Sequence, residues 1–503
     1  MKKIFHKSFL IFSLLIIIVF INNKIYKISK NPTDIPELLN YENQTLNLLV
    51  LKNECKYISP VTIFFNAEFR YLNRSDNYEL RKINLKDKNY FVTYYLNDNY
   101  FYSQYLSLLK DNGLIRSKNI KGNNNLFFGP ISKIPSNKNI DKGTNFNKYQ
   151  KIEGYLSGRH YFHKNSLYIY YKYMKKLFYE DFNYMPETYI FPEDKEIIEN
   201  KFKNYHLNSN DLWLIKPVDK SEGSGIFILS SLKEIKMKNY VITRYISDIS
   251  LINGRKYDLR LYILISGLKP LRIYLYKEGL VRIAIEKYKL AINSINNKYM
   301  HITNTALNIK KHKFIIPNNT NDENANMWNL FMYKRYLRKN KIEWHELLQK
   351  IKDIIIKEII SITNFMKKNK KKLNLEVKNF YKIIGVDILV KKDFNPLLLE
   401  MNYLPGVYFR NNIDKEVKIN LFFDALNIIG IAPYSRKSQK PLNIIKEGKE
   451  IEDNINNAYC ELERPRGSFE LIFPTKENIK DYTKYFETIF PENNIFWKKI
   501  RRK

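Results

Sequence analysis

Polar and apolar residues alternate most regularly between residues 211 and 292 of this 503-residue chain. Successive side chains of a strand point to opposite faces of a sheet, so this alternation predicts strands. The predicted strands are DLWLIKPV, GIFIL, YVITRYI, KYDLRLYILI and LRIYLYKEGLVRIAI. Further along, YKIIGVDILV and PLLLEMN predict two strands joined by the turn KKDFNP.

Helical spacing of apolar residues appears in two other parts of the chain. It predicts helices over residues 164–182 and 327–373. Between residues 60 and 135, VTIFFN and YFVTYYL predict strands, and YFYSQYLSLLKDNG predicts a helix that stops at Gly113. These elements indicate a small α/β lobe, and residues 136–150 are expected to be a loop or an insertion.

The first residues of the chain predict a targeting segment. Lysines at positions 2, 3 and 7 precede the apolar run Phe9–Ile21, a pattern typical of a signal peptide or a signal anchor. No clear small-residue cleavage site follows, which favours an uncleaved membrane anchor over residues 4–26 and leaves a secretory-pathway location open. A buried N-terminal helix is the alternative.

Composition limits the possible functions only coarsely. The apolar fraction of 44%, with 39 Tyr and 31 Phe, supports a sizeable folded core. The formal net charge of +34 favours a polyanionic partner such as nucleic acid, anionic lipid or an acidic protein segment, unless lysine is merely abundant everywhere. Two cysteines exclude a disulfide framework and a cysteine-based zinc site, and they fit a reducing compartment.

One predicted strand carries charged residues at every second position. Lys256, Asp258 and Arg260 would share one face of the sheet, and apolar residues such as Leu259 and Leu261 would form the other. Such a row is either a solvated face or one wall of a site that binds a charged ligand. The strongly apolar opposite face favours the second interpretation.

Two motifs could contact phosphate groups. In WLIKPVDKSEGSGIFIL, Lys216 ends a strand, and the loop of Ser221, Glu222, Gly223, Ser224 and Gly225 could direct backbone N–H groups at a phosphate. The motif is not a P-loop, and an ordinary hairpin turn is the alternative. In HITNTALN, Asn304 either caps a helix or places an amide beside a phosphate.

The strongest chemical signal lies in GVDILVKKDFNPLLLEMN. Glu400 and Asn402 are two residues apart on one strand, and the hairpin would bring them close to Asp387. Neighbouring buried carboxylates repel each other unless a cation lies between them, and this all-oxygen set suits Mg²⁺ shared with substrate phosphates. A purely structural carboxylate pair is the alternative. Together the motifs indicate a nucleotide-dependent ligase, since the protein-kinase signatures are absent.

In these stretches, from about Tyr105 to Tyr408, the chain resembles the tubulin–tyrosine ligase-like family, whose members have an ATP-grasp fold. The resemblance implies a mixed α/β fold with a small N-terminal lobe and with central and C-terminal lobes around an ATP site. The expected domains are a signal anchor or signal peptide (1–30), a linker with the N-terminal lobe (31–135), the ATP-grasp lobes (136–430) and a basic C-terminal extension (431–503).

The resemblance also implies roles for individual residues. Lys216, the loop 221–225 and Asn304, with Thr303 beside it, would contact ATP phosphates, as would Lys164 from GRHYFHKNSL. Arg244, Tyr245 and Ile246 would form the hinge against adenine, and Lys256 and Asp258 would border the sugar and phosphates. Arg260 and Arg282 would hold the acceptor carboxylate or the incoming amino acid. Asp387, Glu400 and Asn402 would ligate Mg²⁺.

In such a family the reaction joins a free amino acid to a protein carboxylate through an acylphosphate. The resemblance implies ATP and Mg²⁺ as cofactors, tubulin or microtubules as the partner, and glutamate as the added amino acid, in a cytoplasm-facing location. It does not imply a nucleic-acid partner. Two alternatives stay open: the ligase adds glycine or tyrosine, or the chain is an inactive, membrane-tethered microtubule-binding protein.

Overall fold

A computed structural model of the chain describes most residues beyond position 103 and short stretches before it. The described residues are 46–51, 65, 80–85, 90–91, 93–96, 104–117, 124–128, 150–154, 158–205, 211–220, 223–229, 231, 239–291, 294, 297–309, 314–317, 322–368, 380–435 and 450–502. Contacts divide the chain into residues 1–46 and residues 47–503, and every described helix and strand beyond residue 51 belongs to the second unit. The anchor predicted for residues 4–26, the strand VTIFFN except Phe65, and the loop 136–150 except its last residue lie outside the described residues.

Strands and helices are interspersed along the chain, as the prediction of a mixed α/β fold requires. The strands are β1 (Leu46–Leu51), β2 (Leu80–Leu85), β3 (Tyr90–Phe91), β4 (Thr93–Leu96), β5 (Ile115–Ser117), β6 (Leu126–Phe128), β7 (Lys151–Glu153), β8 (Thr188–Phe191), β9 (Trp213–Pro217), β10 (Phe227–Ile228), β11 (Tyr240–Arg244), β12 (Leu251–Ile252), β13 (Arg255–Leu268), β14 (Leu271–Tyr276), β15 (Leu280–Ile283), β16 (Met327–Asn329), β17 (Phe380–Val390), β18 (Pro396–Asn402), β19 (Tyr434–Ser435) and β20 (Phe469–Phe473). The helices are α2 (Leu106–Asp111), α3 (Gly158–Tyr161), α4 (Lys164–Leu177), η4 (Tyr179–Asp181), α5 (Lys195–Phe202), α6 (Lys298–His301), α7 (Thr305–Asn308), α8 (Leu330–Lys339), α9 (Trp344–Lys368), α10 (Asn412–Ile429), α11 (Glu450–Glu461), α12 (Ile479–Thr483) and α13 (Pro491–Arg501).

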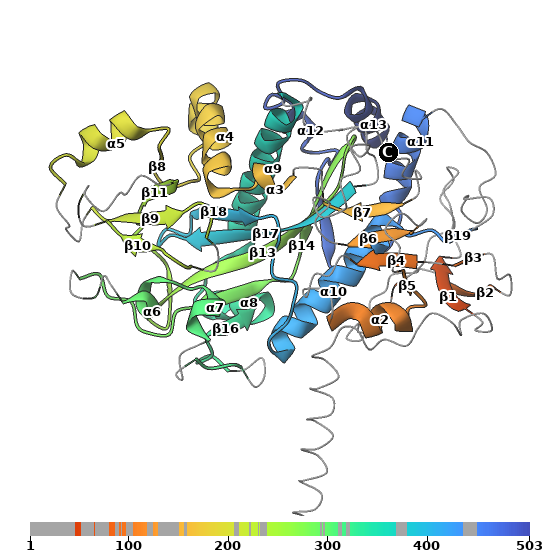
Figure 1. The fold of residues 1–503 in the computed structure, drawn as a ribbon, viewed down its shortest axis with the longest axis horizontal. Coiled ribbons are helices and arrows are strands. Elements are labelled where there is room, and N and C mark those ends of the chain that lie inside the picture. The colour runs from red at the N-terminus through yellow and green to blue at the C-terminus, as the bar shows by residue number, and fades with distance from the viewer. Residues whose placement is uncertain are drawn as a thin grey trace, which may run out of the picture. The chain divides into compact units, whose positions relative to one another are not determined.

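The largest sheet has twelve strands and is organised around the long strand β13. β13 pairs with β15 along residues 257–260, with β17 along residues 259–265 and with β14 along residues 263–268, all antiparallel. β17 also pairs with β18, which confirms the predicted C-terminal hairpin. Figure 1 shows α9 and α10 on opposite sides of these central strands, and all residues of β17 are buried. Burial of apolar side chains from both faces therefore fixes the strands that carry the candidate site.

A second, four-stranded sheet has the antiparallel order β10-β9-β11-β8. One of its faces packs with the helix α5 into an apolar cluster that includes Phe202, Trp213 and Ile215. Because side chains alternate along β9, Leu214 and Lys216 point to the opposite face. That face is available to line a site.

The N-terminal lobe contributes parallel strands to the twelve-stranded sheet. β4 pairs with β5 and β6, β6 pairs with β7, and β7 pairs with β17. The prediction of strand structure in YFVTYYL is confirmed by β3 and β4, and the predicted helix ends just before Gly113, whose φ is +82°. A glycine tolerates this left-handed conformation, which explains why the helix stops there.

The prediction of one helical region over residues 327–373 is wrong in two details. Residues 327–329 form β16, which pairs with β15, and the helical part is broken between α8 and α9. Lys341 has a φ of +59° at this break, a conformation that cannot continue a right-handed helix. Periodicity alone does not reveal such a break, because both helices bury apolar residues at the same spacing.

The C-terminal residues fold onto the rest of the chain. We expected a basic and partly loop-like tail, but α11, β20, α12 and α13 cover most of residues 450–502. β20 pairs with β14, and Asn364 of α9 donates a hydrogen bond to the backbone oxygen of Tyr485 at 2.8 Å. Cys460 at the end of α11 is buried and disulfide-bonded.

The described part of the chain contains no helix that is both long enough and apolar enough to cross a bilayer. The predicted anchor, residues 4–26, precedes that part.

Candidate active site

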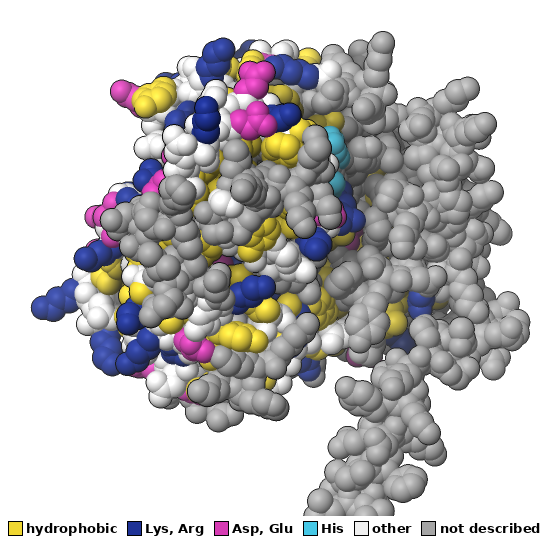
Figure 2. Space-filling model, turned by 60° about the vertical axis from the view of Figure 1, so that its left-hand side comes forward, with side chains coloured by type: hydrophobic (Ala, Val, Ile, Leu, Met, Phe, Trp, Pro, Cys, Tyr) yellow, Lys and Arg dark blue, Asp and Glu magenta, His cyan; other side chains and the backbone are white. Residues whose placement is uncertain are grey.

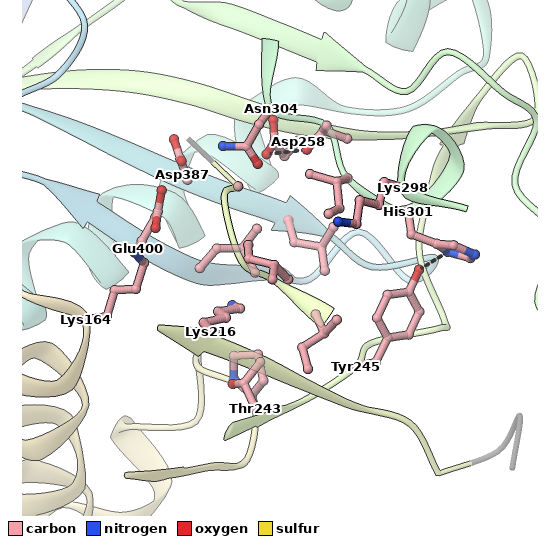
Figure 3. A pocket seen from close by; sticks show the side chains of 18 of the residues that line it. Lys164, Lys216, Thr243, Tyr245, Asp258, Lys298, His301, Asn304, Asp387 and Glu400 are labelled. Atoms are coloured by element: carbon pink, nitrogen blue, oxygen red, sulfur yellow. Dashed lines mark hydrogen bonds between the residues drawn. The ribbon is translucent and has the colours of Figure 1, made fainter. Parts of the chain in front are cut away.

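A pocket of about 190 Å³ lies where the four-stranded sheet faces the strands β13, β15, β17 and β18. Its walls also include Lys164 at the start of α4 and several residues of the segment 298–304. Figure 3 shows these side chains converging on one space from elements that are far apart in the sequence. The motifs selected from the sequence therefore meet at one place.

The charged row on β13 is buried. Lys256 is 8% exposed and Asp258 is 3% exposed, and both line the pocket. The interpretation of this row as a solvated face is therefore wrong, and its interpretation as the wall of a site is supported. Burying charges at this density is unfavourable unless each one is paired or meets a charged ligand.

Asp258 is held by partners on two other segments. The β13–β15 register places it opposite Arg282, whose Nε donates to Oδ1 at 2.7 Å and whose NH2 donates to Oδ2 at 2.6 Å. The hydroxyl of Thr303 donates to the same Oδ2 at 2.8 Å. This bidentate pairing fixes the orientation of both the carboxylate and the guanidinium.

Asp387 is paired with two arginines. The β13–β17 register places it opposite Arg260, whose Nε and NH2 donate to its two carboxylate oxygens at 2.5 and 2.9 Å. NH2 of Arg282 lies 2.9 Å from Asp387 Oδ2. Arg282 therefore bridges Asp258 and Asp387 across three neighbouring strands.

The β17–β18 hairpin brings the three predicted metal ligands together. Asp387 is opposite Glu400, and Asn402 is opposite Gly385. Nδ2 of Asn402 lies 3.2 Å from Glu400 Oε1 and 3.4 Å from Asp387 Oδ2. The predicted proximity of these side chains is confirmed, and Figure 3 shows Asp387 and Glu400 on the same side of the pocket.

The two carboxyl groups differ in their pKa values. Burial opposes ionisation of Asp387, but the charges of Arg260 and Arg282 hold its pKa below the ordinary value. Burial raises the pKa of Glu400, and the neighbouring negative charge of Asp387 raises it further. Glu400 is thus a carboxyl group that lacks a sufficient positive partner, since Lys164 offsets these effects only in part.

This chemistry fits a divalent cation. Two carboxylates and an amide oxygen are hard oxygen ligands of the kind that Mg²⁺ binds, and a cation beside Glu400 would relieve its repulsion with Asp387. The amide of Asn402 would have to present its oxygen, which a rotation of the side chain allows. Among the described residues no cluster of three or more His, Cys, Asp or Glu side chains forms an alternative metal site.

Two cationic side chains line the same pocket as the carboxylates. Lys216 on β9 lines the pocket, and Lys164 reaches across to donate to the backbone oxygen of Lys220 at 2.6 Å. Figure 3 shows Lys164 beside Glu400. Burial lowers the pKa of Lys164, and the nearby Lys216 lowers it further, although Glu400 acts in the opposite direction. Such repulsion between cations favours an anionic ligand in the space between them.

The glycine-rich loop is described only in part. Gly223 and Ser224 line the pocket, whereas Ser221 and Glu222 lie outside the described residues. Gly223 and Gly225 have φ values of +77° and +72°, which a residue with a side chain rarely adopts. Gly225 itself does not line the pocket, and a Cβ there would meet Pro217 at 3.1 Å. The loop therefore needs its glycines for its conformation.

The other end of the pocket is mainly apolar. Its walls include Leu214, Ile228, Tyr245, Ile246, Leu389 and Leu399. Arg244 also lines this region, although its guanidinium lies 3.7 Å from Glu187 and is about half exposed. A flat apolar group such as a purine would fit between the two sheets here, next to the predicted hinge.

Two arginines lie away from the pocket surface. Arg260 does not line the pocket, and its guanidinium is paired with Asp387 on the neighbouring strand β17. Arg272, which is close to Arg282 in sequence, contributes nothing to the pocket: its Nε donates to Glu461 Oε1 at 2.8 Å near the far end of β13. All other predicted site residues within the described part, apart from Gly225, line the pocket.

Sequence reasoning missed several lining residues. Lys298, His301 and Thr243 all contribute side chains to the pocket, as Figure 3 shows. Leu389 could have been found, since it lies two residues from Asp387 on the same strand and therefore on the same face. Lys298 and Thr243 carry no comparable signal, because only the packing of separate segments places them here.

The geometry agrees with comparisons to known proteins. A model of the tubulin-tyrosine ligase family matches residues 142–440, more than half of the chain and nearly every segment around the pocket. This chain belongs to the tubulin-tyrosine ligase family. The mixed α/β architecture is the one expected from the motifs.

The chain is also similar to individual members of this family. The chain is 30% identical to mouse "Tubulin monoglutamylase TTLL4" over 259 residues, which are 50% of this chain and 21% of the relative. It is 29% identical to human "Tubulin polyglutamylase TTLL5" over 52% of this chain and 20% of the relative. It is 28% identical to Caenorhabditis elegans "Tubulin polyglutamylase ttll-4" over 68% of this chain and 62% of the relative. The chain thus spans about a fifth of the length of the mouse and human relatives.

Proposed function

We propose that this protein is an ATP-dependent ligase that joins an amino acid, glutamate, to carboxyl groups of an acidic protein tail, with tubulin as the acceptor. One observation carries the proposal. The strands β13, β15, β17 and β18 bring Asp258, Arg282 and Asp387 to one pocket, which Glu400, Lys164 and Lys216 also line. The family membership and the names of the relatives support it.

The shape of the pocket supports a nucleotide lying along its length. The apolar end beside Tyr245 and Ile246 suits the adenine, and the cationic end beside Lys164 and Lys216 suits the phosphates. Lys256 and Asp258 lie between these two ends. The side chains are positioned by strand register before any ligand binds, so little reorganisation is needed at the moment of reaction.

Asp387, Glu400 and Asn402 are the residues that would hold Mg²⁺. A bound Mg²⁺ would neutralise charge on the phosphate oxygens and would help to orient the terminal phosphoryl group. The protein supplies the remaining positive charge through Lys164 and Lys216, which line the same pocket. Arg260 and Arg282 keep Asp387 ionised.

The proposed reaction has two chemical steps. An oxygen of the acceptor carboxylate attacks the γ-phosphorus of ATP, the bond to the β-phosphate oxygen breaks, and ADP leaves. The nitrogen of the incoming amino acid then attacks the acyl carbon, phosphate leaves, and the nitrogen loses a proton. The cationic pocket favours both steps because it stabilises negative charge on the transferred group and on the departing phosphate. Arg282, which lines the pocket, is our candidate for holding a carboxylate of one substrate.

Surface charge supports an acidic partner. The net charge is +34, and Figure 2 shows Lys and Arg side chains spread over the described part of the visible face, interleaved with apolar ones. Such a distribution attracts an acidic peptide over a wide area. We further propose a cytoskeletal site of action, and the anchor over residues 4–26 remains a prediction from the sequence.

The decisive experiment offers the purified full-length chain ATP, Mg²⁺ and tubulin together with one labelled amino acid at a time. We expect label from glutamate in the tubulin tails, and ADP and phosphate as products. Label from glycine or tyrosine instead would change the assigned amino acid. An absence of any label, with microtubule binding retained, would support the inactive microtubule-binding alternative and would refute the proposal.

A further inference from the structure

A chain of hydrogen bonds leads from the charged row on β13 to a histidine that the proposed reaction does not use. Nζ of Lys256 lies 3.3 Å from the hydroxyl oxygen of Tyr245, and that hydroxyl lies 2.9 Å from Nδ1 of His301. Nε2 of His301 lies 3.1 Å from the backbone oxygen of Ser294. Figure 3 shows the Tyr245–His301 contact at the apolar end of the pocket. The four groups come from four separate segments of the chain.

The donor and the acceptor in each of these hydrogen bonds follow from the last contact, between His301 and the carbonyl of Ser294. A carbonyl oxygen only accepts hydrogen bonds, so Nε2 of His301 carries the proton. In a neutral imidazole the other nitrogen, Nδ1, is then an acceptor, and the hydroxyl of Tyr245 must donate to it. The lone pairs of the tyrosine oxygen are thereby directed to other neighbours. Lys256, whose ammonium only donates, uses one of them.

The surroundings keep the imidazole neutral. Burial lowers the pKa of His301 to about 4, and the positive charge of Lys256 contributes to the shift. The other polar groups around the ring are the hydroxyls of Tyr245 and Tyr288, with Lys298 on the preceding turn of α6. No carboxylate among the described residues is paired with the ring. Protonation of Nδ1 would remove the acceptor. Because the pKa of His301 is about 4, Nδ1 is unprotonated at neutral pH and the series of hydrogen bonds stays intact.

The aromatic ring of Tyr245 holds the same ammonium from a second direction. Nζ of Lys256 lies 4.3 Å from the centroid of this ring, within the range of a cation–π interaction. The tyrosine is 5% exposed and packs against Leu214 and Ile228 on the nucleotide side of the pocket. Its orientation therefore determines where the positive charge of Lys256 lies.

We propose that His301 is a positioning residue: its neutral imidazole orients the hydroxyl of Tyr245, which in turn holds the ammonium of Lys256 at the point where a nucleotide passes from its base to its phosphates. This inference rests on the proposed function only for the identity of the nucleotide. It assigns a role to the first residue of HITN, whose Thr303 binds Asp258 from the same segment. One short stretch thus supports two of the three charges of the β13 row, Lys256 and Asp258.

Two substitutions test each link in the full-length protein. Tyr245→Phe removes the hydroxyl and keeps the ring, and His301→Leu removes the acceptor. Each should weaken binding of a fluorescent ATP analogue about tenfold, the usual effect of losing one hydrogen bond to a charged group. Because the two residues act in one chain, the double variant should be no weaker than either single variant. His301→Asn places an oxygen near the position of Nδ1 and should restore most of the affinity.

A second measurement needs no nucleotide. The pH dependence with which an amine-acetylating reagent labels Lys256, followed by mass spectrometry, reports the protonation of its ammonium. Loss of the acceptor destabilises the charged form, so Tyr245→Phe and His301→Leu should both shift this labelling to lower pH. The matched control is Tyr257→Phe, on the opposite face of the same strand, whose hydroxyl contacts Tyr333 at 2.8 Å. It should change neither the labelling nor ATP binding.

The outcomes separate this inference from the proposed function. Unchanged labelling of Lys256 in both variants, or additive losses in the double variant, would overturn the role of His301. If both variants show the expected labelling shift, and the wild-type protein binds ATP but adds no amino acid to any acceptor, the ligase proposal is refuted and the hydrogen-bond chain is still supported. Failure of His301→Asn to restore affinity would also count against the orienting role.

Discussion

The strand β13 takes part in two buried arginine–carboxylate clusters, one near each end. At its start, Asp258 and Arg260 pair with Arg282 and Asp387 beside the pocket. At its end, Ser266 joins Arg272 and Tyr274 of β14 in binding Glu461, which belongs to α11. Both clusters join neighbouring strands, and their carboxylates are almost completely buried.

The two clusters differ in how completely their charges are compensated. Glu461 accepts hydrogen bonds from a serine, an arginine and a tyrosine, and although burial opposes ionisation, Arg272 holds its pKa below the ordinary value. In the pocket cluster, Glu400 has a raised pKa because it is buried beside Asp387. The comparison teaches that a buried ion pair is not by itself a functional signal. A carboxyl group left short of positive charge at the wall of a cavity is a better one.

The largest effect is expected from a substitution in the pocket cluster, where Glu400 is not fully compensated by positive charge. Glu400→Gln removes one anionic oxygen ligand while keeping the size of the side chain, so amino-acid incorporation should fall by about 10³-fold, the scale of losing one electrostatic contact at a reacting centre. Microtubule binding by the same variant should stay nearly intact in co-sedimentation. Undiminished incorporation would show that Glu400 is not a metal ligand. The two clusters would then not differ in their role in catalysis.

A substitution in the cluster around Glu461 should lower the stability of the protein and leave its activity unchanged. Glu461→Gln leaves Arg272 buried without a full negative charge, and the free energy of unfolding should fall by about 3 kcal/mol, as for other broken buried pairs. Denaturant titration measures this loss, and incorporation per folded molecule should not change. The control is Glu199→Gln in an exposed pair with Lys195, which should cost less than about 0.5 kcal/mol. A large loss of activity without loss of stability would contradict a purely structural role for Glu461.

A smaller effect is expected from the pH dependence of Lys256. Burial lowers the pKa of this lysine to about 8, with Lys216 adding to the shift and Asp258 opposing it. The ammonium is therefore lost as the pH rises through 8, and kcat/KM for ATP should fall about tenfold per pH unit above that point. Lys256→Arg should abolish this alkaline limb, because a guanidinium keeps its proton. A wild-type profile that stays flat to about pH 10 would show that Lys256 does not bind the nucleotide as a cation.

The smallest effect concerns charges outside both clusters. Exposed lysines and arginines are screened by salt, whereas buried pairs are screened much less. Microtubule binding should therefore weaken several-fold between about 50 and about 200 mM salt in co-sedimentation, while the unfolding free energy should change little. Salt-independent binding would contradict a docking surface made of exposed basic residues.

The sequence predicted those parts of the site that depend on short-range alternation. Lys256, Asp258 and Arg260 share a face because they are two residues apart, and the turn after Val390 brings Glu400 back to Asp387. Strand and helix types were predicted for the same reason, since long regular patterns determine which side of an element is buried. These features need no knowledge of distant contacts.

Other features depend on contacts that no local pattern encodes. Arg272 and Arg282 lie on two strands, β14 and β15, that pair with different parts of β13, and only Arg282 reaches the pocket, because Arg272 binds a carboxylate 189 residues away. The place of His301 in the pocket depends on the carbonyl of Ser294 and the hydroxyl of Tyr245. The folded C-terminal residues were predicted as a partly irregular tail for the same reason: their partners lie on β14 and α9.

The pairing of β20 with β14 sets a limit on how the protein can be trimmed. A version that ends at residue 440 would retain every residue that lines the pocket, yet the outer edge of β14 would lose its neighbour and expose unpaired N–H and C=O groups. Strands of other protein molecules can pair with such an open edge. β20 therefore covers an edge of β14 that would otherwise be open to edge-to-edge aggregation.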